Sequence, residues 1–306
     1  MDSFFFNITD TSYKVTNLYK NNDEYINRVD ISNGIVFFDI YFEEHKEKIV
    51  PIKNMDRMVF IPVVKAGSFS IYDNINQTKY ISKTNDINIY CSSKQNYTIT
   101  INSAKKTNVF ILFISDFYMK RYLTKKQNEP IDFLYEKIQG ELSLELINTQ
   151  PIDALSLYII NKICNINIDD NMNSIRCEHN IIEFIIHRFK LIDIYDESIS
   201  FEELDIAKEA KNHLLKNFIT APTIQVLAHL CATNESKLKK VFKKVYKTTI
   251  YGYIQKLRLE KANLLLKDQS LNIGQIALEV GYKHQGHFSK LFFENFGVYP
   301  KDLLKS

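Results

Sequence analysis

The chain has 306 residues, which is enough for two domains of about 100–200 residues each. Apolar residues make up 45% of it and charged residues 25%, which excludes a wholly disordered, collagen-like or disulfide-dense protein. The formal net charge is only +3, but the charge is unevenly distributed. Residues 201–306 contain 17 Lys and Arg against 10 Asp and Glu, a net charge of +7. Residues 1–200 contain the remaining 22 Lys and Arg against 26 Asp and Glu, a net charge of −4. A basic third of this kind is typical of a region that meets a polyanion.

The beginning of the chain and its cysteines predict a cytoplasmic protein. Residues 1–7 lack the basic start and the apolar run of roughly 7–15 residues that a signal peptide has. Apolar stretches such as Val109–Ile114 are far shorter than the roughly 18 residues that span a membrane. The four cysteines are widely separated and form no Cys-x-x-Cys pair, which favours buried free thiols over redox or metal chemistry. We therefore expect no membrane association, no cofactor and no metal.

Residues 33–115 show the pattern of short β-strands. In Ile87–Cys91 and Tyr97–Ile101, apolar and polar positions tend to alternate, as they do in half-buried strands. Clusters of Asn, Gly, Lys and Ser separate the runs, which favours a small antiparallel barrel or sandwich. The other predicted strands are Gly34–Phe42, Met58–Val64, Ser68–Tyr72 and Val109–Ile114.

After Ser115, apolar residues recur at the three- and four-residue intervals of helices. Tyr195–Phe201 is acidic and is the best candidate for a linker. We therefore expect an N-terminal domain over residues 1–200, β-rich over about 33–115 and helical over about 116–194, followed by a second domain over 201–306. The predicted helices of the first domain are Asp116–Leu123, Ile131–Ile138, Ile152–Ile166 and Ser174–Leu191.

The region after Glu203 is helical almost throughout and contains an internal repeat. Two sets of three mainly apolar residues recur, the first with an offset of 49 and the second with an offset of 50. Each half therefore predicts a short helix, a brief turn and a second helix. The repeated sets are Ile224, Leu227 and Ala228 with Ile273, Ile276 and Ala277, and Leu238, Val241 and Phe242 with Phe288, Leu291 and Phe292.

The two halves, at about residues 223–245 and 272–296, have the features of helix-turn-helix motifs. Thr223 and Asn272 are good N-cap residues directly before each first helix. Ala228 and Ala277 are small enough to let two helices cross steeply, and Gly281 supplies a permissive backbone in the second turn. In this motif the second helix lies in the major groove of DNA.

The first candidate recognition helix, Glu235–Val245, separates an apolar face from a basic one. A merely solvated cationic face is the alternative, but the repeated motif favours contact with DNA phosphates and base edges. The residues that we expect to contact DNA are Glu235, Ser236, Lys237, Lys239, Lys240, Lys243 and Lys244, with Lys237, Lys240 and Lys244 along one outward side.

The second candidate recognition helix, at about Gly286–Phe296, is less basic but carries polar residues at its entrance and outer side. Gln can form paired hydrogen bonds with adenine, and Ser or Lys can reach bases or phosphates. The two histidines here have no third ligand nearby in the sequence, so capping or DNA contact is favoured over metal binding. The expected DNA-contacting residues are Lys283, His284, Gln285, His287, Ser289 and Lys290.

Between the two motifs, Ile250–Lys267 has the pattern of a connecting helix. About eighteen residues at 1.5 Å each give a length of roughly 27 Å, and successive major-groove faces on one side of B-DNA lie about 34 Å apart. With side chains and turns added, this helix is long enough to hold two recognition helices against adjacent turns of DNA.

The run from Ile273 to Pro300 resembles the C-terminal signature of the AraC/XylS family of bacterial transcription regulators, as do Leu257–Ala262 in the connecting helix and the ending Gly297–Pro300. The resemblance covers about residues 205–304. It implies a seven-helix unit with two helix-turn-helix motifs that binds double-stranded DNA, usually as an activator that acts on RNA polymerase. Lys247 stands where many members have glycine, so we expect the first recognition helix to end differently.

Members of this family often have a cupin-like β-barrel followed by helices, which binds a small effector or forms a homodimer. The order of strands and helices in residues 1–200 is similar to that plan. The expected fold class is therefore α+β: a small antiparallel β-barrel, cupin-like, with helices, and an all-α C-terminal domain with two helix-turn-helix motifs.

No motif of a common enzyme class is present. The chain has no Gly-x-x-x-x-Gly-Lys, Gly-x-Gly-x-x-Gly or Gly-x-Ser-x-Gly sequence. The alternative function is a small-molecule-binding cupin-type module or metal enzyme whose helical domain mediates protein contacts. Such an iron site needs two histidines and a carboxylate, whereas the predicted barrel contains His45 alone, in a run that is more simply a solvated loop. We therefore expect a DNA-binding activator that is not an enzyme.

Overall fold

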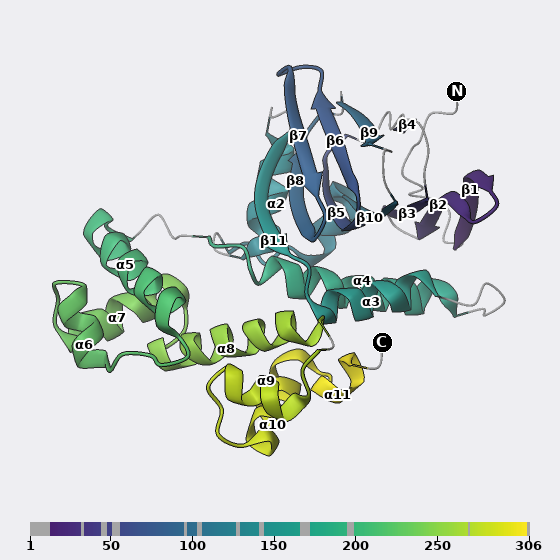
Figure 1. Cartoon of the computed structure of the whole chain (residues 1–306). Coiled ribbons are helices and arrows are strands. Elements are labelled where there is room, and N and C mark those ends of the chain that lie inside the picture. The colour runs from purple at the N-terminus through teal and green to yellow at the C-terminus, as the bar shows by residue number, and fades with distance from the viewer. Residues whose placement is uncertain are drawn as a thin grey trace. The chain divides into compact units, whose positions relative to one another are not determined.

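The chain forms two compact units in the computed structural model (Figure 1). The first unit comprises Met1–Ile152 and Ile159–Ile194, and the second comprises Asp153–Tyr158 and Tyr195–Ser306. The residues that the structure describes are 13–31, 34–43, 48–50, 56–94, 97–102, 106–126, 129–140, 144–165, 172–194, 199–268 and 270–304.

The first unit is built on two antiparallel sheets. One has seven strands in the order β1-β2-β3-β10-β5-β8-β11, and the other has four in the order β4-β9-β6-β7. The strands are β1 (Lys14–Asn21), β2 (Glu24–Ile31), β3 (Ile35–Phe42), β4 (Lys48–Val50), β5 (Met58–Ala66), β6 (Ser68–Asp73), β7 (Thr78–Lys83), β8 (Asp86–Ser92), β9 (Tyr97–Asn102), β10 (Thr107–Ser115) and β11 (Glu145–Pro151).

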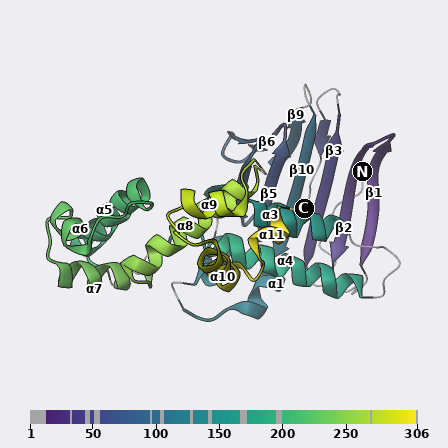
Figure 2. The ribbon, with the colours of Figure 1, turned by 60° about the horizontal axis from the view of Figure 1, so that its bottom comes forward.

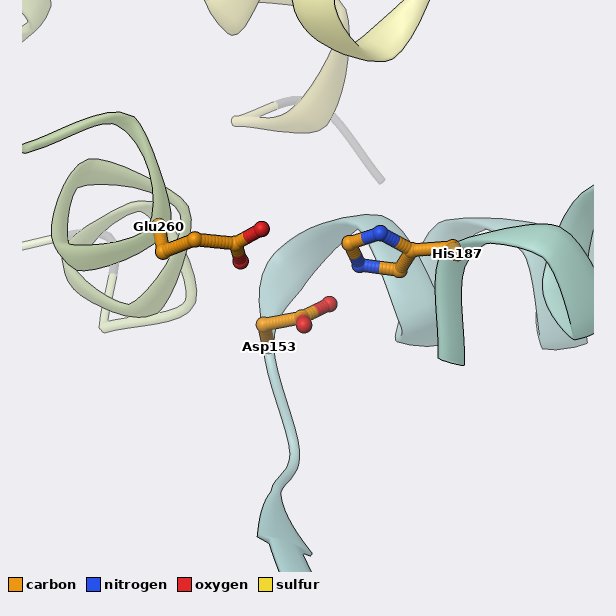
Figure 3. Close-up of side chains that lie close together, drawn as sticks. All are labelled: Asp153, His187 and Glu260. Atoms are coloured by element: carbon orange, nitrogen blue, oxygen red, sulfur yellow. The ribbon is translucent and has the colours of Figure 1, made fainter. Parts of the chain in front are cut away.

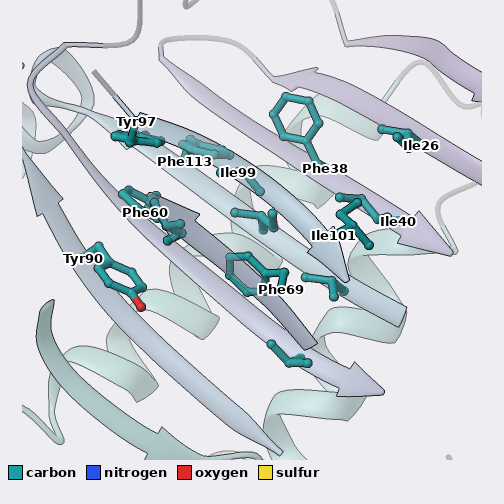
Figure 4. Packing of buried hydrophobic residues seen from close by; sticks show 14 of the residues in the cluster. Ile26, Phe38, Ile40, Phe60, Phe69, Tyr90, Tyr97, Ile99, Ile101 and Phe113 are labelled. Atoms are coloured by element: carbon teal, nitrogen blue, oxygen red, sulfur yellow. The ribbon is translucent and has the colours of Figure 1, made fainter. Parts of the chain in front are cut away.

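The two sheets share one hydrophobic core (Figure 4). Side chains of β3, β5 and β10 from the larger sheet meet those of β6 and β9 from the smaller one. Phe60 lies at the centre of an aromatic stack, with its ring centroid 4.9 Å from that of Tyr90, 5.4 Å from Tyr97 and 5.5 Å from Phe113. Each fully buried phenylalanine contributes about 1.5–3 kcal/mol to folding, so this stack holds the two sheets together.

Helices cover the other face of the seven-stranded sheet. Helix α2 packs on β5 and β8, and the Phe184 ring of α4 contacts the Phe110 ring of β10 at a centroid distance of 6.3 Å. Because β8 and β10 are covered on both faces, their residues are almost all buried, without the alternation of a half-exposed strand. The helices of this unit are α1 (Asp116–Met119), the 3-10 helix η1 (Lys120–Tyr122), α2 (Pro130–Gln139) and α4 (Asn173–Phe189), while α3 (Ala154–Cys164) is divided between the two units at Ile159.

The predicted fold class is confirmed, with two differences in the first unit. The hairpin of β1 and β2 lies before residue 33, where the sequence analysis began the β-rich region, and its turn places Asn22 at a φ of 50°. Strand β11 lies inside the region predicted to be helical. It lies between the predicted helices Ile131–Ile138 and Ile152–Ile166 and pairs with β8 at the edge of the sheet, so its strand conformation depends on backbone hydrogen bonds to a distant segment.

The second unit consists of helices, arranged along one long helix (Figures 1 and 2). Helices α5, α6 and α7 lie at one end of α8, and α9, α10 and α11 lie at the other. The bounds are α5 (Phe201–Asn217), α6 (Ile224–Leu230), α7 (Glu235–Tyr246), α8 (Ile250–Leu266), α9 (Ile273–Glu279), α10 (Gln285–Phe296) and α11 (Pro300–Leu303). The predicted linker falls partly on residues 195–198, which lie outside the described residues, and α5 begins at its last residue.

All four cysteines are free thiols, as the sequence predicted. Cys91, Cys177 and Cys231 are buried, and Cys164 is half-buried. Desolvation by burial raises the pKa of Cys231 to about 11 and that of Cys164 to about 12. Among the described residues, no helix is both long enough and apolar enough to cross a bilayer.

Candidate nucleic-acid interface

The two halves of the second unit repeat the same capped first helix. Thr223 accepts a hydrogen bond from the Val226 backbone at 3.3 Å and so caps α6. Asn272 caps α9 in the same way, with the Gln275 backbone 3.0 Å away, and the Gln275 side chain completes a capping box. Both N-caps are therefore where the sequence predicts them, and each satisfies a backbone N–H that the helix itself leaves unpaired.

The two turns also have the same geometry. In the first, Thr233 N donates to Ala228 O at 3.0 Å, and in the second, Tyr282 N donates to Ala277 O at 2.8 Å. Both alanines are buried where the two helices cross. The second residue after each first helix takes a left-handed conformation, with φ of 47° at Ala232 and 89° at Gly281. Each half is thus a helix-turn-helix, in which α7 and α10 are the second helices.

Helix α7 buries one face and exposes a basic one. Leu238, Val241, Phe242 and Val245 are buried. At 100° per residue, the positions opposite this face are Ser236, Lys240 and Lys243, and all three are exposed. Asn234 caps the helix through a 2.8 Å hydrogen bond from the Lys237 backbone. The outermost surface of α7 is therefore polar and cationic.

The lysines along one edge of α7 are paired with acidic residues of α5. Lys237 Nζ lies 2.6 Å from Glu202 Oε1, and Lys244 Nζ lies 2.5 Å from Glu203 Oε2. Salt bridging to Lys244 is the main cause that lowers the pKa of the Glu203 carboxyl. The sequence predicts Lys237, Lys240 and Lys244 on one outward side. The structure separates them, because Lys237 and Lys244 turn toward α5 while Lys240 lies on the outermost face.

The opposite edge of α7 carries Glu235 and Lys239, which form an i,i+4 ion pair of 3.3 Å. The lysine is about half exposed, and pairs of this kind contribute only about 0.3–0.5 kcal/mol. Lys239 can therefore leave its partner for a phosphate at small cost.

Helix α10 presents its polar residues at its N-terminal end. Gln285, Gly286 and His287 are exposed in its first turn, and the His287 ring lies 5.9 Å from that of Tyr282 in an edge-on arrangement. His284 is the N-cap residue but makes no side-chain capping hydrogen bond. Ser289 is half-buried, Lys283 is exposed, and Lys290 lies 3.9 Å from Glu294. Lys283, His284, Gln285 and His287 thus surround the N-terminal end of the helix, whereas Ser289 and Lys290 lie nearer its middle.

Comparison with known proteins agrees with this architecture. A family model described as a helix-turn-helix domain matches residues 227–306. The HTH-type transcriptional regulator AlkR of Acinetobacter baylyi is 39% identical over 79 residues, which are 26% of each protein. The transcriptional activator AggR of Escherichia coli is 29% identical over 125 residues, which are 40% of this chain and 45% of AggR. The aligned regions thus span less than half of both relatives.

Residues 227–306 thus belong to a helix-turn-helix domain that is similar to part of these transcription regulators. A crystal structure of ToxT from Vibrio cholerae O395 is also similar to the chain, at 16% identity and a TM-score of 0.33, with 89% of this chain and 97% of ToxT covered.

Helix α7 ends as a glycine-terminated helix does, so the expectation of a different ending is wrong. Lys247 is the C-cap of α7 and has a φ of 55°, and Gly297, fifty positions later, is the C-cap of α10 with a φ of 73°. The lysine adopts the left-handed conformation that glycine favours.

Helix α8 connects the two helix-turn-helix motifs and carries an arginine, Arg258, that no sequence pattern indicated. The helix has 17 residues, which correspond to about 26 Å. The Arg258 side chain donates to backbone carbonyls of residues 218, 219 and 281.

Glu202 and Glu203 were missed as well. The Ser200-x-x-Glu203 spacing was a detectable sign of a capping box at the start of α5, but nothing local indicated which lysines the acids would meet.

Three ionisable side chains that the sequence analysis did not discuss are drawn in Figure 3. Asp153 precedes α3 and accepts a hydrogen bond from the Ser156 backbone at 2.7 Å, so it caps that helix. Glu260 lies on α8 and His187 on α4. Asp153 and Glu260 belong to the second unit, and His187 belongs to the first. Neither unit by itself therefore holds all three side chains. His45, the histidine of the predicted barrel, lies outside the described residues.

The first unit contains an apolar cavity of about 350 Å³. It lies among α1, η1, the start of α2, and α4, and its lining includes Ile131, Ile182 and Phe189. The Tyr118 and Tyr122 hydroxyls, 3.5 Å apart, belong to two of its lining residues. An apolar cavity with a few polar groups is typical of a small-molecule site.

Proposed function

We propose that the protein is a sequence-specific DNA-binding transcription activator, in which α7 and α10 read two successive major grooves. One observation carries the proposal: the helix-turn-helix occurs twice on one 17-residue helix, and both recognition helices expose polar or cationic side chains. Double-stranded DNA is then the main partner, RNA polymerase the protein partner, and the cytoplasm the place of action. No reaction is assigned to the chain.

The positions of the α7 side chains suggest which of them would contact base edges and which would contact phosphates. Ser236, Lys240 and Lys243 lie on the outermost surface, so they would enter the groove and reach base edges and phosphates. Lys237 and Lys244 would reach phosphates at the groove wall after leaving Glu202 and Glu203. Glu235 and Lys239 border the opposite wall.

Helix α10 would read bases more than it neutralises phosphates. Gln285, in its first turn, has the side chain that pairs best with adenine. His284, His287 and Ser289 surround it, and Lys283 and Lys290 supply the positive charges for the backbone of the second groove.

The first unit would regulate the second by binding a small effector. The apolar cavity beside α4 supports this part of the proposal, because its size and lining suit an apolar or amphipathic compound. Ile186 is a half-exposed lining residue, so Ile186→Glu should remove binding of an effector found by thermal-shift screening without unfolding the unit. Sedimentation with and without that compound tests whether the unit also pairs two copies.

The DNA-binding part is tested with duplexes that the full protein selects from a random library. Counterion release makes the affinity fall steeply between about 50 and 200 mM salt. Lys240→Ala should weaken DNA binding roughly three- to tenfold at low salt. It should also reduce the steepness of the plot of log affinity against log salt concentration by about 1. Lys216→Ala, which removes an exposed lysine from α5, is the matched control and should leave binding unchanged.

The proposed reading of bases by α10 is tested by selecting duplexes from the random library with the Gln285→Ala variant. Loss of a paired contact costs about 1–3 kcal/mol of discrimination at one base pair, so one position in one half-site should lose its preference. Failure of the wild-type protein to select any duplex, or an affinity that does not depend on salt, would contradict the proposed function and favour a ligand-binding module.

A further inference from the structure

The two helix-turn-helix motifs are joined by α8 and are separated beside it by a cleft. The cleft has a volume of about 460 Å³, and its walls include Thr223 from the first motif and His287 from the second. Helices α7, α9, α10 and α11 each pack on α8. The orientation of one recognition helix relative to the other therefore depends on what ties each motif to this helix.

Arg258, on α8, lines the cleft and is hydrogen-bonded to the end of α5 and to the turn of the second motif. Its Nε donates to Phe218 O at 3.0 Å and its Nη2 to Ile219 O at 2.8 Å, both at the end of α5. Its Nη1 donates to Gly281 O at 3.2 Å, in the turn of the second motif. The guanidinium also lies over the Tyr282 ring, 5.7 Å from its centroid. One side chain thus joins the end of α5, which packs on α7 of the first motif, to the turn of the second motif.

The three carbonyls suit a guanidinium for a physical reason. They follow the C-terminal ends of α5 and α9, where the helices leave carbonyls unpaired and the helix dipole is negative. A planar cation with five donors in a fixed fork can serve three acceptors at once, whereas the single ammonium of lysine cannot hold the same geometry.

The second motif also leaves room for this contact. A Cβ at Gly281 would lie 3.1 Å from Arg258 Cζ and 3.1 Å from Ile219 O. The glycine therefore lets the turn approach the guanidinium closely, in addition to taking the positive φ of the turn. The arginine and the glycine form one arrangement that holds the second motif against the end of α5.

We propose that Arg258 is a positioning residue that fixes the orientation of α10 relative to α7, and thereby the spacing between the two half-sites that the protein accepts. The DNA part of this inference rests on the proposed function. Two rigidly linked modules bind their second site at a high effective concentration, which falls when the link loosens. Loss of the hydrogen bonds from the Arg258 guanidinium should therefore weaken DNA binding to paired half-sites more than DNA binding to a single half-site.

The orientation is measured first without DNA, in the full chain. Spin labels are attached through unnatural amino acids at positions 240 and 290, so that the native thiols remain, and the distance distribution between them is recorded by pulsed electron resonance. Arg258→Lys keeps the charge and should broaden the distribution. Arg258→Met should broaden it further, and Lys261→Met, which removes a charge from the same helix, should not. A distribution for Arg258→Lys as narrow as that of the wild type, with the same mean, would overturn the proposal.

The spacing is then measured with selected duplexes that hold one half-site, both half-sites, or both with the spacer changed by about 5 base pairs, roughly half a helical turn. For Arg258→Lys we expect about tenfold weaker binding to the paired sites, less than about twofold change on a single site, and a smaller penalty for the altered spacer. An equal loss on single and paired sites would mean that Arg258 contacts DNA instead of positioning a motif. If the wild type selects no duplex, the proposed function fails, while the label distances still decide the positioning role.

Discussion

Single residues in the two turns show how the same geometry is reached at different cost. Ala232 and Gly281 occupy equivalent positions and both have a positive φ. Glycine adopts this conformation freely, whereas a residue with a Cβ pays roughly 1–2 kcal/mol for it. The first motif therefore carries backbone strain that the second avoids, and the same holds for Lys247 compared with Gly297.

Ala232→Gly should relieve this strain. After the larger backbone entropy that glycine loses on folding is subtracted, we expect a gain of about 0.5–1 kcal/mol in the free energy of unfolding of the second unit, measured by urea titration. Gly281→Ala is the opposite change and should destabilise by more than this, because its Cβ would also press on Arg258 and Ile219. A loss of stability in Ala232→Gly would show that the φ of Ala232 carries no strain.

Between elements, the acidic start of α5 pairs with lysines of α7 that the proposed function assigns to DNA contact. Glu202 is largely exposed and Lys237 about half exposed, so their attraction is screened by water and contributes only about 0.2–1 kcal/mol. A phosphate that approaches Lys237 must displace this carboxylate. The ion pairs thus hold the lysine side chains in place in the unbound protein. Breaking them would reduce the free energy gained on DNA binding by a small amount.

Glu202→Gln should therefore strengthen DNA binding. Removal of the competing charge should raise the affinity for a selected duplex about 1.5- to 5-fold and steepen the salt dependence by up to about 0.9 in the log–log slope. Glu209→Gln makes the same charge change elsewhere on α5, at an exposed residue, and is expected to have a smaller effect. Equal effects of the two variants would mean that only the net charge of the unit matters.

At the scale of the whole molecule, the chain has separate hydrophobic cores in its two units. The first core fills the space between the two sheets, and the second lies among α5, α6, α7 and α8. Burial of apolar surface is the main stabilising contribution to each unit, and units with their own cores need not unfold together. The charge follows the same division, because the basic excess is confined to residues 201–306.

Calorimetry should accordingly record two unfolding transitions in the full chain. A selected duplex at about 100 times its dissociation constant should stabilise only the second unit, by about 2.7 kcal/mol, which raises the midpoint of that transition by roughly 10–20 °C. The other transition should stay in place, and an effector found by screening should move it instead. A single transition that shifts as a whole with DNA would contradict this division.

Local patterns in the sequence were sufficient for much of the second unit. The apolar repeat at offsets of 49 and 50 located α6, α7, α9 and α10, and Thr223, Asn234 and Asn272 cap their helices as their residue types predict. Helix periodicity and capping involve residues within about four positions of one another, so one sequence contains the whole signal. The outward position of Lys240 follows from the same periodicity, whereas Lys243, which was expected to flank that side, lies on the outermost face.

Strand pairing and long-range side-chain contacts were decided by the tertiary structure. The sequence predicted the strand β10, but not its place between β3 and β5, and it predicted a helical region where β11 pairs with β8. It placed Lys237 beside Lys240, whereas α5, some 35 positions earlier, turns Lys237 to Glu202. Arg258 likewise meets carbonyls 40 and 23 positions away. Such contacts depend on how whole elements pack, because hydrogen bonds and ion pairs act over a few ångströms in space regardless of separation along the chain.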